Sequence, residues 1–107
     1  MARRPSFQTL QVLQAMLEKP TGDHYGLELS RKAGLASGTI YPLLRRLEVS
    51  GWVTSAWEDV DPSAEGRPRK RLYTLTGEGE RAARLYLAEA RKKLSLPSIT
   101  APGPAFS

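Results

Sequence analysis

Cysteine is absent from the 107 residues, and histidine occurs once, as His24. The lack of cysteine excludes a disulfide framework, a thiolate metal site and a cysteine nucleophile. A single histidine leaves too few of the ligands that zinc or iron prefers, so we expect no metal site and no cofactor. We interpret His24 as a turn residue.

The chain also lacks the segments that would direct it to a membrane. No apolar run approaches the roughly 18 residues that cross a bilayer. The basic start, Met1–Pro5, is not followed by the apolar stretch of a signal peptide. We therefore expect a cytoplasmic protein with no membrane partner.

Catalytic motifs are missing as well. The sequence contains no nucleophile-and-base arrangement, no glycine-rich phosphate loop and no nucleotide fingerprint. Asp59 and Asp61 lie in a polar stretch, not in the apolar surroundings that tune a carboxyl group for acid catalysis. We therefore expect that the protein is not an enzyme.

Basic residues are in excess. The 16 lysines and arginines outnumber the 11 acidic residues and give a net charge of +5. This balance favours a polyanionic partner such as nucleic acid. Hydrophobic residues make up 40% of the chain, which is enough for one small domain with a modest core.

Capping signals predict two helices near the start of the chain. Ser6 can cap the first helix, which Pro20 would end. Asp23 can cap a second helix over Tyr25–Ala33, and Gly34 suits the position just after it.

A third helix follows a short link and ends near Gly51. Either Ser37 or Thr39 can cap it, and Pro42 favours the later start because proline is tolerated only in a first turn. Its apolar residues recur at helical spacing and form a buried stripe: Ile40, Leu43, Leu44 and Leu47.

The pattern then changes to strands. Trp52–Trp57 and Lys70–Leu75 are rich in β-branched and aromatic residues, and the turn residues of Glu58–Arg69 between them predict a long hairpin tip. Thr76 opens a last helix. The order predicts a mainly α fold with a small β-hairpin, a winged helix-turn-helix domain of order α-α-α-β-β-α. We expect a basic arm (1–5), this domain (6–76), a C-terminal dimerisation helix (77–94) and a flexible tail (95–107).

The first and last helices carry wide apolar stripes. Their members are Leu10, Leu13 and Leu17 in the first helix and Ala83, Tyr86, Leu87, Ala90 and Leu94 in the last. Any one stripe can belong to the core. Two such stripes exceed what one small core absorbs, so we expect a homodimer interface.

Motifs from three parts of the chain resemble one family. The segment Ser37–Glu48, SGTIYPLLRRLE, followed by Gly51–Val53, is similar to the third helix of the PadR family of bacterial transcriptional regulators. Tyr25–Leu29, YGLEL, resembles the opening of that family's second helix. Gly66–Lys70 and Tyr73–Gly79 resemble its wing and the start of its last helix.

The resemblance implies a homodimeric repressor on a pseudo-palindromic operator of double-stranded DNA. It also implies that the first and last helices build the dimer. In many members a small aromatic molecule binds near that interface and releases the DNA. The chain departs from the family's pattern at Gly77, where proline is frequent, and its region after the wing is short, as in the short branch of the family.

The third helix is then the recognition helix, because an α-helix fits the major groove. Its candidate DNA-binding residues are Ser37, Gly38, Thr39, Tyr41, Pro42, Arg45 and Arg46. The candidate wing residues are Arg67, Arg69 and Lys70, whose cations can follow phosphates or enter the minor groove. Arg3 and Arg4 can form a further minor-groove arm.

Each of these assignments has a simpler alternative. The helix residues can be a packed or solvated face, and the wing cations can pair with the acidic residues Glu58, Asp59, Asp61 and Glu65. Trp52 and Trp57 can line an effector pocket, but we favour structural roles, with Trp52 in the core and Trp57 covering the strand. For the whole chain the alternative is a winged-helix module that binds proteins without binding specific DNA.

Overall fold

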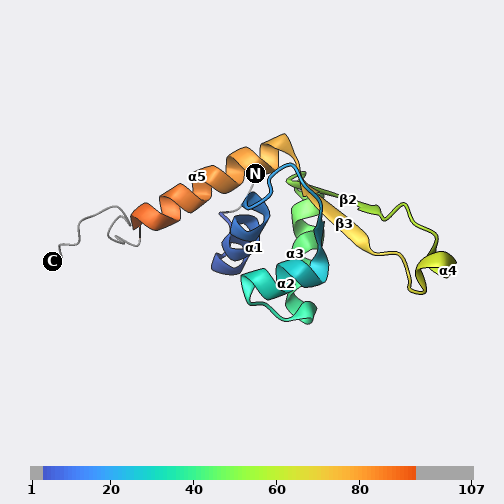
Figure 1. The fold of residues 1–107 in the computed structure, drawn as a ribbon. Coiled ribbons are helices and arrows are strands. Elements are labelled where there is room, and N and C mark those ends of the chain that lie inside the picture. The colour runs from blue at the N-terminus through green and yellow to red at the C-terminus, as the bar shows by residue number, and fades with distance from the viewer. Residues whose placement is uncertain (1–3, 94–107) are drawn as a thin grey trace.

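Three helices and a β-hairpin wing lie beside a long C-terminal helix in the computed structural model, which describes residues 4–93 (Figure 1). The elements are α1 (Phe7–Leu17), β1 (His24–Tyr25), α2 (Gly26–Ala33), α3 (Ser37–Val49), β2 (Val53–Trp57), α4 (Pro62–Glu65), β3 (Arg71–Leu75) and α5 (Gly77–Lys93). The wing and the far end of α5 extend to opposite sides of the helical cluster. The winged helix-turn-helix fold expected from the sequence is confirmed.

The caps of the first two helices agree with the sequence in part. Ser6 caps α1, since its side chain accepts a hydrogen bond from the Thr9 backbone N–H at 3.1 Å. Asp23 does not cap α2, because its carboxylate accepts a hydrogen bond from the Thr74 hydroxyl at 2.8 Å. The helix begins one residue later than expected, after Tyr25 as the N-cap.

Strand β1 was missing from the sequence-based expectation. It pairs antiparallel with β3, and the sheet has the order β1-β3-β2. His24 is therefore a strand residue, 1% exposed, and its Nε2 lies 3.0 Å from the Lys19 carbonyl oxygen. The turn assignment of His24 was wrong, because two residues are too few for a periodic strand signal.

Helix α3 starts earlier than Pro42 suggested. It begins at Ser37 with Ala36 as the N-cap, which places Pro42 inside the helix. The later start was therefore wrong. Proline removes the hydrogen bond that its N–H would donate to the Gly38 carbonyl. The helix continues past it because the stripe on its opposite side is buried: Ile40, Leu43, Leu44 and Leu47.

The two wing strands agree with the sequence to within one residue. Strands β2 and β3 pair antiparallel from Val53↔Leu75 to Trp57↔Arg71. The tip contains a short helix, α4, that was not expected. Asp61 caps it by accepting a hydrogen bond from the Ser63 N–H at 3.0 Å, and Gly66 ends it at φ 69°.

The core is formed by side chains from all three N-terminal helices, the sheet and α5. Trp52 belongs to it, as we favoured, and its ring stacks on that of Tyr86 with centroids 6.0 Å apart. Leu13 and Ala83 are also fully buried there. These two residues therefore fill the core of one chain and offer no surface to a partner, contrary to our expectation.

Helix α5 can approach the hairpin closely because it contains Gly79. A Cβ atom at this position would lie 2.0 Å from the Trp52 carbonyl oxygen. The same carbonyl accepts a hydrogen bond from the Thr76 N–H at 3.0 Å. The start of α5 is thus fixed by backbone contact against Trp52, the residue immediately before β2.

Some expectations fall outside the described residues, namely those for Arg3, Leu94 and the tail 95–107. Helix α5 is described as far as Lys93, with Glu78 and Glu80 in its first turn and basic residues in its last. Within residues 4–93, no helix is both long and apolar enough to span a membrane.

A cluster of hydrogen bonds around the Glu58 carboxylate connects the wing to the start of α2. Glu58, only 8% exposed, accepts hydrogen bonds from both ends of the Arg67 guanidinium, at 2.7 and 3.2 Å. It also accepts from the Lys70 backbone N–H at 2.8 Å and from the Tyr25 hydroxyl at 3.1 Å. Arg67 and then the Lys70 N–H lower the pKa of Glu58 to about 2. The bond to Glu58 raises the pKa of the Tyr25 hydroxyl.

Because of this cluster, we expect part of the free energy of unfolding to be lost in acid. Because the pKa of Glu58 is lowered from 4.5 to about 2, its contribution is complete above about pH 4.5 and is lost as pH falls toward 2. We expect Glu58→Gln to remove much of that pH dependence, measured as the urea midpoint across this range. Glu65→Gln is the control, since Glu65 lies on the same loop but 3.9 Å from Arg67. An unchanged pH profile in Glu58→Gln would contradict the cluster's role.

Candidate nucleic-acid interface

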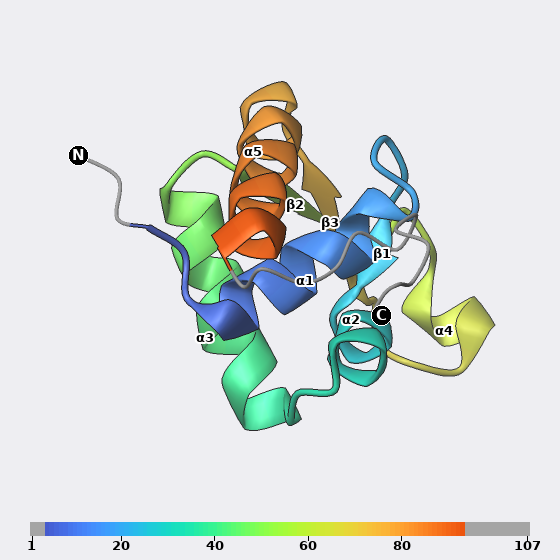
Figure 2. The ribbon, with the colours of Figure 1, turned by 90° about the vertical axis from the view of Figure 1, so that its left-hand side faces the viewer.

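The outer face of α3 carries the residues proposed for DNA recognition. Of these, Thr39 is half-buried and the others are exposed: Ser37, Gly38, Tyr41, Pro42, Arg45 and Arg46. Figure 2 shows α3 at one side of the molecule, with no other element outside it. Apart from Thr39, these side chains are thus accessible to a partner, and we call the side of α3 that carries them its open face.

Tyr41 has both a packing role and an exposed surface. A Cβ atom at Gly26 would lie 2.5 Å from the Tyr41 ring. The ring therefore packs on the start of α2, where only glycine leaves room for it. Tyr41 is still 42% exposed. The packing alternative holds for one side of this ring, and the other side faces solvent.

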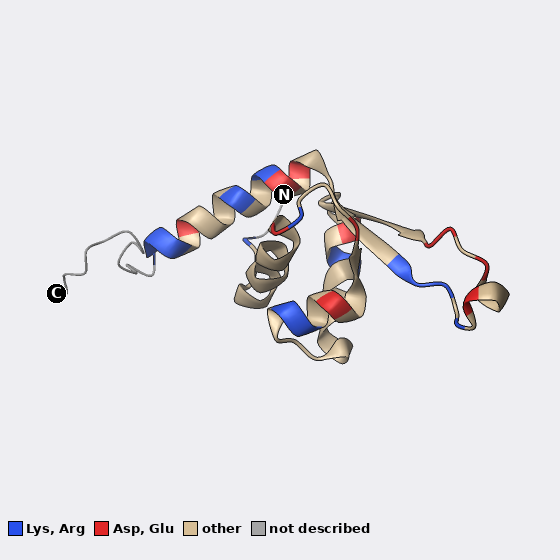
Figure 3. Cartoon of the chain, viewed as in Figure 1, with Lys and Arg blue, Asp and Glu red and all other residues tan. Residues whose placement is uncertain are grey.

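The three wing cations have different surroundings. Arg67 is paired with Glu58, as the ion-pair alternative proposed. The Arg69 Nε donates to the Val60 carbonyl at 2.9 Å, and the Lys70 ammonium lies 4.6 Å from the centroid of the Tyr25 ring. Figure 3 shows acidic residues on the chain leaving β2 and basic residues on the chain returning to β3. Arg69 and Lys70 are exposed, whereas Arg67 is held within the wing.

Within the described residues, helices α1 and α5 carry the rest of the expected dimer residues. All are half-buried: Leu10, Leu17, Tyr86, Leu87 and Ala90. Phe7, which is 69% exposed, was not among the residues expected from the sequence. Phe7, Leu10, Gln14 and Leu17 follow the three-and-four spacing of a helix seam. That spacing was visible in the sequence, but Gln14 interrupts its apolar character.

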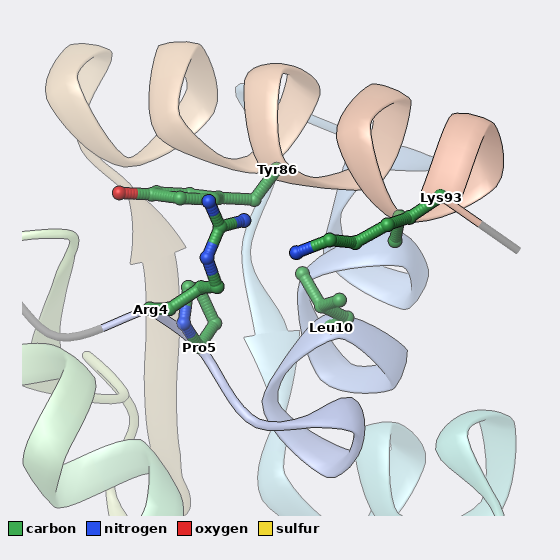
Figure 4. Close-up of a pocket in the computed structure, with 6 residues that line it drawn as sticks. Arg4, Pro5, Leu10, Tyr86 and Lys93 are labelled. Atoms are coloured by element: carbon green, nitrogen blue, oxygen red, sulfur yellow. The ribbon is translucent and has the colours of Figure 1, made fainter.

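A shallow recess lies between the start of the described chain and α5 (Figure 4). It has a volume of about 110 Å³ and is lined by Arg4, Pro5, Leu10, Tyr86, Ala90 and Lys93. Figure 4 shows the charged ends of Arg4 and Lys93 directed into the space between the Tyr86 ring and Leu10. The recess therefore combines an aromatic wall, an apolar wall and two cations.

Arg4 does not project as an arm. It bonds to the Glu89 carboxylate at 2.7 Å, and its guanidinium carbon lies 5.8 Å from the centroid of the Tyr86 ring. Arg4 therefore packs against α5 and does not form the extended arm that we expected.

Solved structures of transcriptional regulators share this fold. A PadR family regulator from Clostridium difficile R20291 matches with a TM-score of 0.69 and 23% identity, over 84% of this chain and 93% of that one. Bordetella bronchiseptica BpsR, whose DNA binding is regulated by 6-hydroxynicotinic acid, matches with a TM-score of 0.71 and 18% identity, over 92% of this chain and 70% of that one.

A third structure is NadR in complex with 4-hydroxyphenylacetate, with a TM-score of 0.64 and 22% identity over 84% of this chain. The match covers 58% of NadR, so the chain spans less than two thirds of that protein. At these identities the likeness shows a common fold.

The sequence itself decides the family. Among curated proteins none matches the chain. The model of the PadR-like family of transcriptional regulators matches residues 12–85, which include α2, α3 and the whole wing. The chain therefore belongs to the PadR-like family of transcriptional regulators.

Proposed function

We propose that the chain is a homodimeric repressor that binds a specific, pseudo-palindromic duplex through α3 and the wing. The observation that carries this proposal is the open face of α3 with its two arginines, Arg45 and Arg46, beside an extended wing that bears exposed cations. Repression is steric, because a dimer on its operator blocks access to the DNA.

Helix α3 enters the major groove, where base edges present distinct donors and acceptors. Ser37 and Thr39 lie in its first turn, the part of a recognition helix that meets base edges. Arg45 and Arg46 lie further along the same open side and reach a guanine edge or a phosphate. Most of the hydrogen bonds go to phosphates and sugars.

The wing adds phosphate contacts. Arg69 and Lys70 are exposed and are available to follow the backbone. Arg67 belongs to the same surface, but its bidentate pair with Glu58 gives it first a role in shaping the wing. The acidic residues beside these cations limit the attraction to any DNA regardless of sequence.

Dimerisation through α1 and α5 supplies the second recognition helix. The seam is Phe7, Leu10, Gln14 and Leu17 on α1, together with Tyr86, Leu87 and Ala90 on α5. A two-fold axis there places the two copies of α3 about 34 Å apart, one turn of B-DNA.

We further propose that an aromatic acid releases the DNA by binding the recess between α1 and α5. Tyr86 offers a ring for stacking, and Arg4 and Lys93 offer cations for a carboxylate. The acids that accompany BpsR and NadR support this ligand class. Because Leu10 and Ala90 line both the recess and the proposed seam, a ligand there changes the spacing of the recognition helices.

One prediction from this proposal concerns the arginines of α3. Arg45→Ala and Arg46→Ala should each weaken binding about tenfold, because each removes a charge-assisted contact. A gel shift with DNA flanking the chain's own gene, with scrambled DNA as competitor and salt varied, measures this. Arg81→Ala, which removes an equal charge at an exposed residue of α5, should bind like the unaltered chain.

Two results of that gel shift would contradict the proposal. If the unaltered chain gives no shift even at low salt, a protein-binding module explains the fold better. If Arg45→Ala and Arg46→Ala leave both affinity and preference over scrambled DNA unchanged, α3 is not the recognition helix.

A second prediction concerns the seam. Phe7→Glu and Leu17→Glu should convert the dimer to a monomer, since each places a carboxylate in the apolar contact. Sedimentation velocity measures the mass. Leu27→Glu, at an exposed apolar residue of α2, should remain dimeric. A dimer that survives both seam substitutions would place the interface elsewhere.

A third prediction concerns the recess. 4-Hydroxyphenylacetate or 6-hydroxynicotinic acid should bind the chain and lower its affinity for the duplex, as measured by calorimetry and gel shift. Tyr86→Ala should weaken ligand binding about tenfold by removing the stacking ring. Leu85→Ala, at the neighbouring exposed residue, is the control. Equal binding of a neutral phenol would refute the role of the two cations.

A further inference from the structure

A polar chain connects α3 to the root of the wing. The Arg71 guanidinium donates to the Ser55 hydroxyl from Nε at 3.1 Å and from Nη2 at 2.9 Å. The Ser55 hydroxyl in turn donates to the Glu48 carboxylate at 2.7 Å. The guanidinium carbon also lies 4.9 Å from the centroid of the Trp57 ring. Arg71 was absent from the wing residues chosen on sequence alone.

The register of the sheet places this chain on the face directed toward α3. Trp57 pairs with Arg71, and Ser55 pairs with Tyr73. Side chains alternate between faces along a strand, so these residues share a face with the buried Val53 and Tyr73. This face of the sheet is therefore buried in the core at Val53 and Tyr73 and becomes exposed toward Trp57. Glu58, one position beyond Trp57, belongs to the opposite face.

The surroundings of Tyr73 agree with this placement. Burial raises the pKa of its hydroxyl, and the charge of Arg71 opposes that rise. Glu48 and Tyr41 on α3 are also close enough to contribute. Residues of α3 and of the wing root thus lie close together, where a duplex seated on α3 would pass the wing.

Arg71 is held in a geometry that suits an external acceptor. Two of its nitrogens are committed to Ser55, and among the contacts within residues 4–93 its Nη1 has no hydrogen-bond partner. A guanidinium fixed on an aromatic ring loses little rotamer freedom when it binds a phosphate. The Glu48 carboxylate does not compete for it directly, because Ser55 stands between them.

Trp57 is the second component of this surface. It is 60% exposed, although Trp52 in the same hairpin is 7% exposed. Its ring carries the guanidinium on one side. Such an exposed aromatic edge beside a cation matches the apolar sugars and charged phosphates of a nucleic-acid backbone.

We propose that Arg71 is a DNA phosphate-binding residue at the root of the wing, that Trp57 packs against the adjoining sugar, and that Glu48 and Ser55 are its positioning residues. The proposal rests on the DNA-binding function argued above. It adds a contact between those of α3 and those of Arg69 and Lys70, so that the protein follows the backbone without a gap.

The decisive variant is Arg71→Ala, compared with Arg81→Ala of equal charge. We expect Arg71→Ala to weaken binding to operator and to scrambled DNA alike by about tenfold. It should also reduce the slope of log K against log salt by about 0.9 for each protomer bound. Arg71→Lys should retain the slope but lose affinity, because lysine cannot hold the fork on Ser55. Thermal unfolding of each variant verifies that the fold is intact.

Trp57 gives a readout that does not depend on affinity. Acrylamide quenching reports the exposed tryptophan, and Trp57→Phe identifies its share of the signal. We expect saturating duplex to protect Trp57, and Ser55→Ala to weaken binding without abolishing that protection.

The possible results distinguish a failure of this inference from a failure of the proposed repressor function. If Arg71→Ala binds as Arg81→Ala does, Arg71 is not a phosphate contact. If Trp57 stays accessible on bound DNA, Trp57 does not pack against a sugar. The repressor function stands in either case, provided that Arg45→Ala and Arg46→Ala lose affinity. If the unaltered chain binds no duplex, both proposals fail together.

Discussion

The burial of one side of α3 is the constraint on which the rest of the molecule depends. Ile40, Leu43, Leu44 and Leu47 are each at most 5% exposed, and burying such side chains stabilises the fold by about 2 kcal/mol apiece. This energy holds the helix together across Pro42, where one backbone hydrogen bond is missing. It also fixes the rotation of α3, so that its polar side faces outward as a unit.

The wing is then oriented by two polar networks, one on each face of the sheet. On one face Glu58 gathers Arg67, Tyr25 and the Lys70 N–H and ties the loop to the start of α2. On the other face Ser55 connects Arg71 to α3. The Glu58 carboxylate binds the Arg67 guanidinium within the wing, whereas Arg71 keeps Nη1 available to an acceptor outside the chain.

The surface of α1 and α5 combines two roles in our proposals. Leu10 and Ala90 line the recess, and they also belong to the seam that would join two copies. A ligand and a partner helix thus act on the same side chains. In these proposals, that arrangement couples ligand binding to the distance between the two copies of α3 without any long pathway through the core. Arg4, placed against Tyr86 by its bond to Glu89, is part of the same surface.

The sequence by itself determined the order of the four longer helices and the two wing strands, the buried stripe of α3 and the charged wing, because these follow from local patterns of period, capping and turn residues. It could not determine β1, since two residues around His24 form a strand only when β3 provides an edge. It could not assign Leu13 to the core of one chain, because stripe width does not show which neighbour covers it. Nor could it decide that Glu58 binds Arg67 while Arg71 faces α3. Which cation meets which carboxylate depends on the register and twist of the folded hairpin, and only the tertiary structure decides that.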